Sequence, residues 1–381
     1  MSIYLDNAAT TPVCPEASEA ALRAMTEVYG NPSSTHKAGR DAKKLLDASR
    51  VKLAAALGCA QGELYFTSGG SESDNWAILN GAALHARYGR HILSSAAEHS
   101  AVLQCLEELE RRGFSVTRLK PETGGGVSVS AVLSALREDT CLVTLMTVNN
   151  ETGAVSPIAE IARAVKARNP HALIHTDAVQ AFCKLPLNTR ALGADLISLS
   201  GHKIHAPKGI GALYIRQGIN LPPLIRGGGQ EGGKRAGTEP LPLIAAFAAA
   251  AEAYRADTGA EERLRQNRAH ILSRLLAENP GLLVLSPEDG APHILSLSLP
   301  GYRSEVLMNF LEARDIYVSK SSACKKGGRS YVLSELGLAP AVIDGALRIG
   351  LSRLTTQREA DELCDVLRLA RETLRTSVRH P

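Results

Sequence analysis

Short apolar runs alternate with segments of helical periodicity between about residue 60 and residue 216. The runs carry few alternating polar residues, as expected for strands that are covered on both faces of a sheet. They are residues 64–67, 91–94, 116–119, 141–148, 173–175, 196–199 and 212–215. The helical patterns between them include residues 72–87, 101–112 and 157–169. This alternation predicts an α/β fold with a mostly parallel sheet and right-handed crossovers.

A second, smaller α/β unit is predicted towards the C-terminus. A stretch rich in glycine and proline, residues 222–240, is typical of an ordered loop, and a helical stretch follows from Leu243 to about Glu278. From Pro292 onward, further strand and helix patterns alternate. A chain of 381 residues also has the length of two domains, at roughly 150 residues each. We therefore predict a large domain over residues 16–255 and a small domain built from residues 1–15 and 256–381.

Composition and charge exclude several classes of protein. Hydrophobic residues make up 44% and charged residues 22%, which is ordinary for a globular protein and excludes wholesale disorder. The net charge of +4 is small and scattered, and aromatic residues are only 4%. Neither direct nucleic-acid binding nor membrane binding is therefore expected. The most apolar stretch, residues 241–251, is too short to span a bilayer and contains Pro242.

The cysteines indicate a reducing compartment. All seven are far apart in the sequence and none forms a C-x-x-C pair, so neither a disulfide framework nor a cysteine-based zinc site is expected. The N-terminus, MSIYLDNAAT, carries Asp6 where a signal peptide would need an apolar run. We therefore expect a cytoplasmic protein.

Three polar motifs follow strands of the predicted sheet at their carboxyl ends, where ligands collect in sheets of this kind. Lys203 follows the strand at 196–199, and a partly desolvated amine at this point could form an imine. Asp177 follows the strand at 173–175, and its carboxylate could pair with a protonated pyridine nitrogen. The small residues at 67–72, TSGGSE, lie where a strand meets a helix and could cradle a phosphate.

Each motif also has a plain structural interpretation. Lys203 could be a surface lysine, Asp177 a helix N-cap, and residues 67–72 a tight turn with a serine cap. Together, however, an anion cradle, a carboxylate for a ring nitrogen and an amine for an aldehyde fit one ligand, pyridoxal 5'-phosphate. His99, which follows the strand at 91–94, is either a polar loop histidine or a flat ring that stacks on this cofactor.

The sequence resembles the NifS/IscS-like cysteine desulfurases of the pyridoxal-phosphate-dependent class V aminotransferase superfamily. The matching stretches follow the family order and extend from residue 4 to about residue 356. They are YLDNAATTPV, GNPSSTHKAGR, FTSGGSESDN, AAEHSAV, TVNNETGAV, HTDAVQ, SLSGHKIHAPKGIGALY, GGGQEGGKRAGT, SSAC and ALRIGLSR. The resemblance implies pyridoxal-phosphate transferase fold type I, pyridoxal 5'-phosphate as cofactor, L-cysteine as substrate and a homodimer.

The resemblance also implies roles for the residues around the cofactor. Lys203 would carry the cofactor as an imine, and Asp177 would hold the pyridine nitrogen. Gln180 would reach the phenolic oxygen, while His99 would stack on the ring and act as an acid or base. The phosphate would be bound by Gly70, Ser71, Ser200 and His202, together with Thr238 of the partner subunit.

Two residues are assigned to the substrate side. Arg348 lies in an apolar strand pattern, where an unpaired guanidinium is costly, so it either forms a structural ion pair or binds a carboxylate bidentately. The resemblance implies that Arg348 and Asn150 hold the carboxylate of the substrate.

Cys324 lies in the polar loop at 320–329, among four basic residues that favour its thiolate.

By resemblance, Cys324 is the nucleophile that takes the sulfur as a persulfide and leaves L-alanine. The sulfur would then pass to an acceptor protein, such as the scaffold of iron–sulfur cluster assembly or a tRNA-thiolation enzyme. A selenocysteine lyase or another pyridoxal-phosphate-dependent C–S lyase is the alternative enzyme, and a non-catalytic scaffold is the alternative of a different class.

Two further patterns are rejected on their own chemistry. Residues 228–234 have the spacing of a phosphate-binding loop, but Arg235 stands where that loop requires serine or threonine. His202 and His205 are three residues apart, but no third ligand is near in the sequence, so no metal site is expected.

Overall fold

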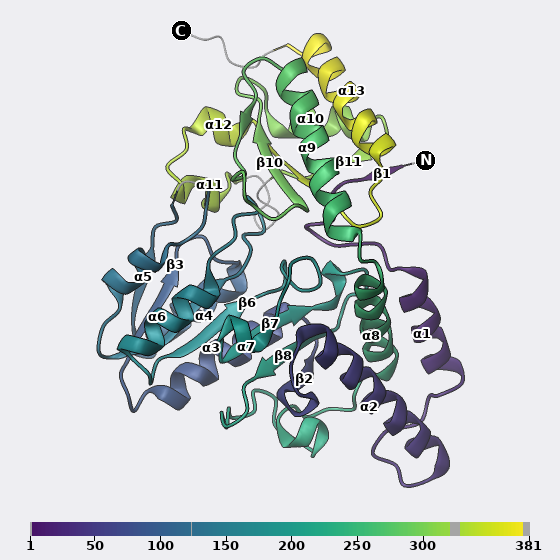
Figure 1. The fold of residues 1–381 in the computed structure, drawn as a ribbon, viewed down its shortest axis with the longest axis vertical. Coiled ribbons are helices and arrows are strands. Elements are labelled where there is room, and N and C mark those ends of the chain that lie inside the picture. Colours follow the sequence, from purple (N-terminus) through teal and green to yellow (C-terminus); the bar gives the residue numbers. More distant parts are fainter. Residues whose placement is uncertain (1, 123, 321–327, 376–381) are drawn as a thin grey trace.

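The computed structural model describes residues 2–122, 124–320 and 328–375, and a seven-stranded sheet lies at the centre of its larger part (Figure 1). The strand order is β2-β8-β7-β6-β5-β3-β4. The strands are β2 (Leu64–Thr67), β3 (His91–Ser95), β4 (Ser115–Leu119), β5 (Thr140–Met146), β6 (Leu173–Asp177), β7 (Leu196–Ser200) and β8 (Gly211–Ile215). All pairs from β7 to β4 are parallel, and only β8 runs against its neighbours. The predicted α/β fold with a mostly parallel sheet is confirmed.

Helices cover both faces of this sheet, which explains why its central strands are apolar throughout. Neighbouring residues along β6 and β7 enter different hydrophobic clusters: Leu173 and Leu196 pack with one face, and Ile174 and Ile197 with the other. The first face is covered by α3 (Gly70–His85) and α4 (Ser100–Arg111). The second is covered by α2 (Lys37–Leu57), α6 (Ile158–Arg168) and α8 (Leu241–Ala256).

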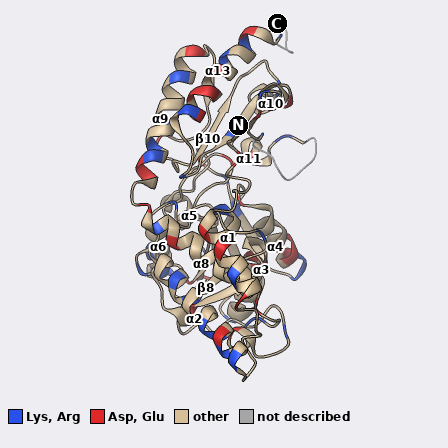
Figure 2. Ribbon diagram, turned by 90° about the vertical axis from the view of Figure 1, so that its right-hand side faces the viewer, with Lys and Arg blue, Asp and Glu red and all other residues tan. Residues whose placement is uncertain are grey.

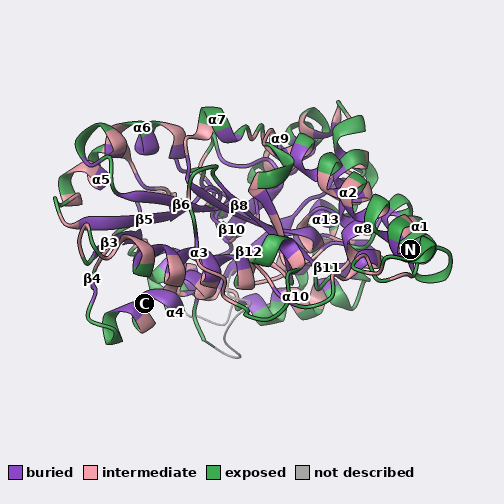
Figure 3. Ribbon diagram, turned by 90° about the horizontal axis from the view of Figure 1, so that it is seen from below, coloured by how far each residue is buried: buried purple, intermediate pink, exposed green. Residues whose placement is uncertain are grey.

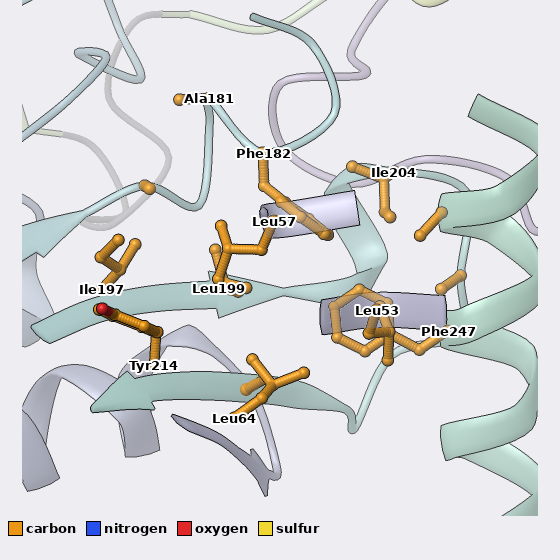
Figure 4. Packing of buried hydrophobic residues seen from close by; sticks show 14 of the residues in the cluster. Leu53, Leu57, Leu64, Ala181, Phe182, Ile197, Leu199, Ile204, Tyr214 and Phe247 are labelled. Carbon is orange, nitrogen blue, oxygen red and sulfur yellow. The ribbon is translucent and has the colours of Figure 1, made fainter. Parts of the chain in front are cut away.

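The core beneath the second face is seen closely in Figure 4. Leu53 and Leu57 of α2 and Phe247 of α8 pack against Leu199 of β7, and all four are at most 1% exposed. Figure 3 shows the same layering from below, with buried strands between partly exposed helices. The remaining helical segments of this part are α1 (Pro15–Thr26), α5 (Val129–Ala135), α7 (Thr189–Leu192) and the 3-10 turns η1 (Gln61–Glu63), η2 (Gly201–Lys203) and η3 (Gln230–Gly233).

The C-terminal part has a sheet and a hydrophobic cluster of its own. Its strands are β9 (Leu283–Val284), β10 (Ile294–Ser298) and β12 (Ala346–Gly350), in the order β12-β10-β9 with both pairs antiparallel. Its helices are α9 (Ala260–Glu278), α10 (Ser304–Glu312), α11 (Tyr331–Glu335), α12 (Pro340–Asp344) and α13 (Gln357–Thr373). Figure 2 shows acidic and basic residues mixed along α9 and α13, where Arg274 pairs with Asp361 at 3.0 Å.

The helical stretch that was predicted from Leu243 to about Glu278 is two helices. It is interrupted at residues 257–259, between α8 and α9. The interruption has a packing reason, since Phe247 of α8 belongs to the core of the large sheet whereas Leu264 and Ile271 of α9 belong to the C-terminal cluster. A single straight helix could not pack against both cores.

The N-terminal segment crosses between the two sheets. Strand β1 (Ile3–Tyr4) pairs in parallel with β11 (Ile316–Tyr317) of the C-terminal part. A few residues later, the backbone N–H of Thr11 donates to His202 O at 2.9 Å, beside the large sheet. Residues 3–14 therefore touch both parts of the molecule. Across the described ranges, no helix combines the length and the apolar character that a membrane span requires.

Candidate active site

A cavity of about 310 Å³ lies at the carboxyl edge of the large sheet. Ten of the predicted site residues line it together, although they come from segments spread over most of the chain. They are Gly70, Ser71, His99, Asn150, Asp177, Gln180, Ser200, His202, Lys203 and Arg348. The structure thus brings together, at one edge of the sheet, side chains that lie far apart in the sequence.

Strand ends and a helix start position the polar groups. Asp177 is the last residue of β6, Ser200 is the last residue of β7, and Gly70 begins α3 three residues after the end of β2. A Cβ atom on Gly70 would lie 2.8 Å from Val179 Cγ2, so only glycine brings the backbone this close to the loop after β6. The free N–H groups of the first turn of α3 thus face a space where an anion is favoured.

The amine of Lys203 is held by two backbone carbonyls. Nζ donates to Ala8 O and to Ala9 O, at 2.7 Å in each case. Lys203 itself lies in η2, directly after β7, and its side chain is half-buried. A primary amine is therefore fixed inside the cavity by the N-terminal segment.

Two carboxyl groups lie in the cavity wall, and the sequence predicted only one of them. Asp177 accepts a hydrogen bond from Val179 N at 2.9 Å, and burial raises its pKa, although the nearby His99 and Lys203 partly offset this. Asp74 of α3 is 1% exposed, and burial, reinforced by the charge of Asp177, raises its pKa well above the usual range. The two neighbouring carboxyl groups therefore do not both carry a full charge.

The histidines of the site are neutral. Burial lowers the pKa of His202 to about 3 and also lowers that of His99. His99 is the N-cap of α4, and its Nδ1 accepts from Ala101 N at 3.2 Å, which assigns the ring proton to Nε2. His175 lies behind Asp74, with Nε2 at 3.6 Å from Asp74 Oδ1, and burial lowers its pKa to about 3.

The opposite wall carries a permanent cation. Arg348, in the middle of β12, is 2% exposed; its Nη2 donates to Asp6 Oδ1 at 3.0 Å and to Ser319 Oγ at 2.8 Å. Its Nη1 donates to the backbone O of Asn150 at 2.9 Å. Among the described residues, Arg348 Nε and Asn150 Oδ1 are buried without a hydrogen-bond partner. Arg348 therefore forms the ion pair that the sequence left open, and it keeps hydrogen-bonding capacity beside the cavity.

Comparison with known proteins gives the family. The model of the family described as Aminotransferase class-V matches residues 3–363. The chain belongs to the class-V aminotransferase family. One relative, "Cysteine desulfurase IscS" of Methanosarcina thermophila, is 40% identical over 369 residues, covering 96% of this chain and 91% of the relative. Another, "NifS/IcsS protein homolog" of Lactobacillus delbrueckii subsp. bulgaricus, is 42% identical and covers 94% of both chains.

Solved structures agree with this assignment. A structure described as "NIFS-LIKE PROTEIN" has a TM-score of 0.92 and 35% identity, covering 98% of this chain and all of its own. A second, described as "SspA in complex with cysteine", has a TM-score of 0.82 and 34% identity, covering 93% of this chain and all of its own. The fold is thus pyridoxal-phosphate transferase fold type I, and the predicted resemblance to NifS/IscS-like proteins is confirmed.

As a class-V aminotransferase, the protein depends on pyridoxal 5'-phosphate, and the cavity fits this cofactor. The buried Asp177 would gain a cationic partner from a protonated ring nitrogen. The close approach of backbone at Gly70 leaves room for a phosphate at the start of α3, and Lys203 supplies an amine for the aldehyde. The predicted cofactor is therefore confirmed by the family and matched by the residues.

Of the predicted site residues that the structure describes, Thr238 alone does not line the cavity. Thr238 is exposed on the loop before α8, outside the cavity of its own subunit. Cys324 lies outside the described residues. For the described ranges, no group of three or more potential metal ligands is present, and the stretch at 228–234 forms η3, away from the cavity.

Three buried acids in or next to this site were not predicted from the sequence. Asp74 lies inside a helical pattern, and a single polar residue there is ordinarily exposed. Glu98 and Glu151, next to His99 and Asn150, are also buried, and burial raises their pKa values to about 8 and about 7. The only available signal was that each acid directly precedes or follows a predicted site residue, or shares its helix.

Proposed function

We propose that this protein is a cysteine desulfurase that converts L-cysteine to L-alanine and holds the released sulfur as a persulfide on Cys324. The atoms balance, because one thiol and L-cysteine give one persulfide and L-alanine. The observation that carries the proposal is the set of groups that line one cavity. An amine and a buried carboxyl lie on one wall, and a buried guanidinium lies on the other. The relatives named as cysteine desulfurases support the choice of substrate.

The substrate carboxylate is assigned to Arg348 and Asn150. A planar guanidinium recognises a carboxylate through parallel N–H donors, and Arg348 Nε is not yet engaged by the protein. The pairing with Asp6 holds the guanidinium in place and lowers the cost of keeping it buried. Arg348 can thus orient an amino acid with its reacting end towards Lys203.

The cofactor supplies an electron sink that weakens the bond between Cβ and sulfur of the substrate. Lys203 would hold its aldehyde carbon, Asp177 would keep a proton on its ring nitrogen, and Gln180 would face its phenolic oxygen. His99, neutral and with its proton on Nε2, can stack on the ring and move a proton. The phosphate is assigned to Gly70, Ser71, Ser200 and His202.

The subunit organisation is also part of the proposal. The exposed position of Thr238 is compatible with a phosphate contact made by Thr238 of the partner subunit, which requires a homodimer. The separate hydrophobic clusters support a large domain over residues 16–255 and a small domain of residues 1–15 and 256–381. The persulfide sulfur would be delivered to an acceptor protein of iron–sulfur cluster assembly or tRNA thiolation.

A reducing compartment, the cytoplasm, is proposed as the place of action. Six cysteines of the described ranges are free thiols. Burial raises the pKa of several of them, including Cys59, Cys105 and Cys183, each to about 12. These thiols are therefore poor nucleophiles at neutral pH, and the assignment of Cys324 as the sulfur acceptor has no rival among them.

The decisive experiment is incubation with L-cysteine, followed by quantification of alanine and mass spectrometry of the Cys324 peptide. We expect one alanine for each sulfur released, and a mass increase of one sulfur atom on Cys324. Cys324→Ser should retain the bound cofactor but lose sulfide release in the presence of a reductant, whereas Cys59→Ser should retain activity. Pyruvate in place of alanine, or near-normal turnover by Cys324→Ser, would contradict the proposal.

A further inference from the structure

A second lysine lies buried behind the cavity wall, in a place that the reaction as described does not use. Lys184 is 4% exposed and lies in the turn that follows β6. Its predecessor Cys183 has φ of 62°, a left-handed conformation that is unfavourable for a residue with a side chain. The backbone therefore accepts strain at the point where it turns Lys184 inward.

The amine of Lys184 reaches a residue of the cavity wall. Nζ donates to Gln180 Oε1 at 3.4 Å, and the other end of the same amide, Nε2, donates to Ala8 O at 2.9 Å. Ala8 O is also one of the two carbonyls that hold Lys203. The two lysines are thus connected through one side-chain amide and one backbone carbonyl.

This arrangement fixes which way the Gln180 amide points. An amide has an acceptor end and a donor end of almost the same shape, so only its partners distinguish the two orientations. The Lys184 amine donates to Oε1 and the Ala8 carbonyl accepts from Nε2, so both partners favour the orientation in which Oε1 faces Lys184, away from the pocket. The NH₂ end is then left on the side of Ala8 and the cavity.

Keeping an amine at this position is costly. Burial, with the added repulsion of Lys203, lowers the pKa of Lys184 to about 7, and in the described ranges Lys184 forms no ion pair with a carboxylate. The imidazole of His293 is buried beside it and is kept neutral by burial and by the Lys184 charge. A methionine of similar length would fill the same space without this desolvation cost. A compensating role is therefore expected.

We propose that Lys184 is a positioning residue that orients the Gln180 amide, so that its NH₂ group is presented to the phenolic oxygen of pyridoxal phosphate. This inference rests on the proposed role of Gln180 at the cofactor. Without Lys184, only the carbonyl of Ala8 still orients the amide, and Oε1, which repels an oxygen anion, turns more easily towards the pocket. Lys184 thus acts on the cofactor through Gln180 and has no need to touch it.

A double-mutant cycle tests this. The dissociation constant of pyridoxal phosphate is measured by equilibrium dialysis against the apo forms of the full-length wild type, Lys184→Met, Gln180→Ala and the double variant. We expect Lys184→Met to weaken binding about tenfold and to shift the visible absorbance of the bound cofactor. In the Gln180→Ala background the same substitution should cause no further weakening.

Two results would overturn the proposal. One is an equal weakening by Lys184→Met in both backgrounds, which would show that Lys184 acts through its charge or through general packing. The other is an unchanged affinity in either single variant. If Lys184→Met does not fold, Lys184→Leu serves in its place with the same expected weakening, whereas Lys184→Gln, which retains a donor, should bind the cofactor within about threefold of the wild type. Alanine formation by the wild type is measured separately, so that failure of the desulfurase assignment is distinguishable from failure of this inference.

Discussion

The two walls of the cavity are built in different ways. The wall on the large sheet takes its polar groups from the ends of parallel strands and the start of α3, each within a few residues of a recognisable motif. The wall on the C-terminal sheet depends on Arg348, whose partners Asp6 and Asn150 are distant in the sequence. One wall is therefore set by local structure, and the other by the way distant segments dock.

The walls also differ in the kind of charge they carry. On the large sheet, burial moves the pKa values of carboxyl and imidazole groups towards their neutral forms, as for Asp74 and His175. Arg348 keeps its charge because a guanidinium does not lose its proton in proteins. Under the proposed function, the first wall would bind the cofactor and move protons, and the second would recognise the carboxylate of the substrate.

The largest expected effect is the loss of the amine on the first wall. Lys203→Ala should reduce alanine formation from L-cysteine by about a thousandfold or more, because both the attachment of the cofactor and a proton-transferring amine are removed. The measurement is the initial rate at saturating L-cysteine, with circular dichroism to verify folding. Lys208→Ala is the matched control, since this lysine is exposed five residues further on. Comparable losses in both variants would contradict the assignment.

A smaller but more selective effect is expected on the second wall. Arg348→Lys keeps a positive charge but loses the planar set of donors, so KM for L-cysteine should rise roughly 30-fold. The affinity for pyridoxal phosphate, measured by equilibrium dialysis, should change less than about threefold. An equally large loss of cofactor affinity would contradict the proposal that the first wall binds the cofactor and the second wall recognises the carboxylate.

The smallest effect concerns a buried acid next to His99 of the first wall. Glu98 is 1% exposed, and burial raises its pKa to about 8, so between about pH 5 and pH 8 the folded state binds a proton that the unfolded state has released. Its contribution to stability should therefore fall as pH rises. The free energy of unfolding of the wild type should fall between about pH 5.5 and pH 7.5. In Glu98→Gln this fall should be about 2 kcal/mol smaller.

Urea unfolding at the two pH values measures this difference. The control is Glu107→Gln on the exposed side of α4, which should leave the pH dependence of the wild type unchanged. A Glu98→Gln variant with the same pH dependence as the wild type would show that the carboxyl of Glu98 is ionised in the folded state.

The contrast between the walls also explains what could be predicted from the sequence. The motifs around Gly70, Asp177 and Lys203 follow strands of one sheet, and parallel strands bring their carboxyl ends together whatever the details of packing. The ion pair of Arg348 with Asp6 was not predictable in this way, because it requires the segment after β1 to dock beside the end of β12, where Asp6 bridges to Gly350. Nor was the break at residues 257–259, which depends on which core each helix faces.

The N-terminal segment has a consequence for how the protein is made. Ala8 and Ala9 hold the amine of Lys203, yet the neighbouring backbone at Leu5 and Asn7 exchanges hydrogen bonds with Gly350. The backbone at Leu5 and Asn7 is thus synthesised long before its partner Gly350 and cannot reach its final position until β12 has been made. A nascent chain that stalls before β12 would already contain every strand of the large sheet and still lack an assembled reaction centre.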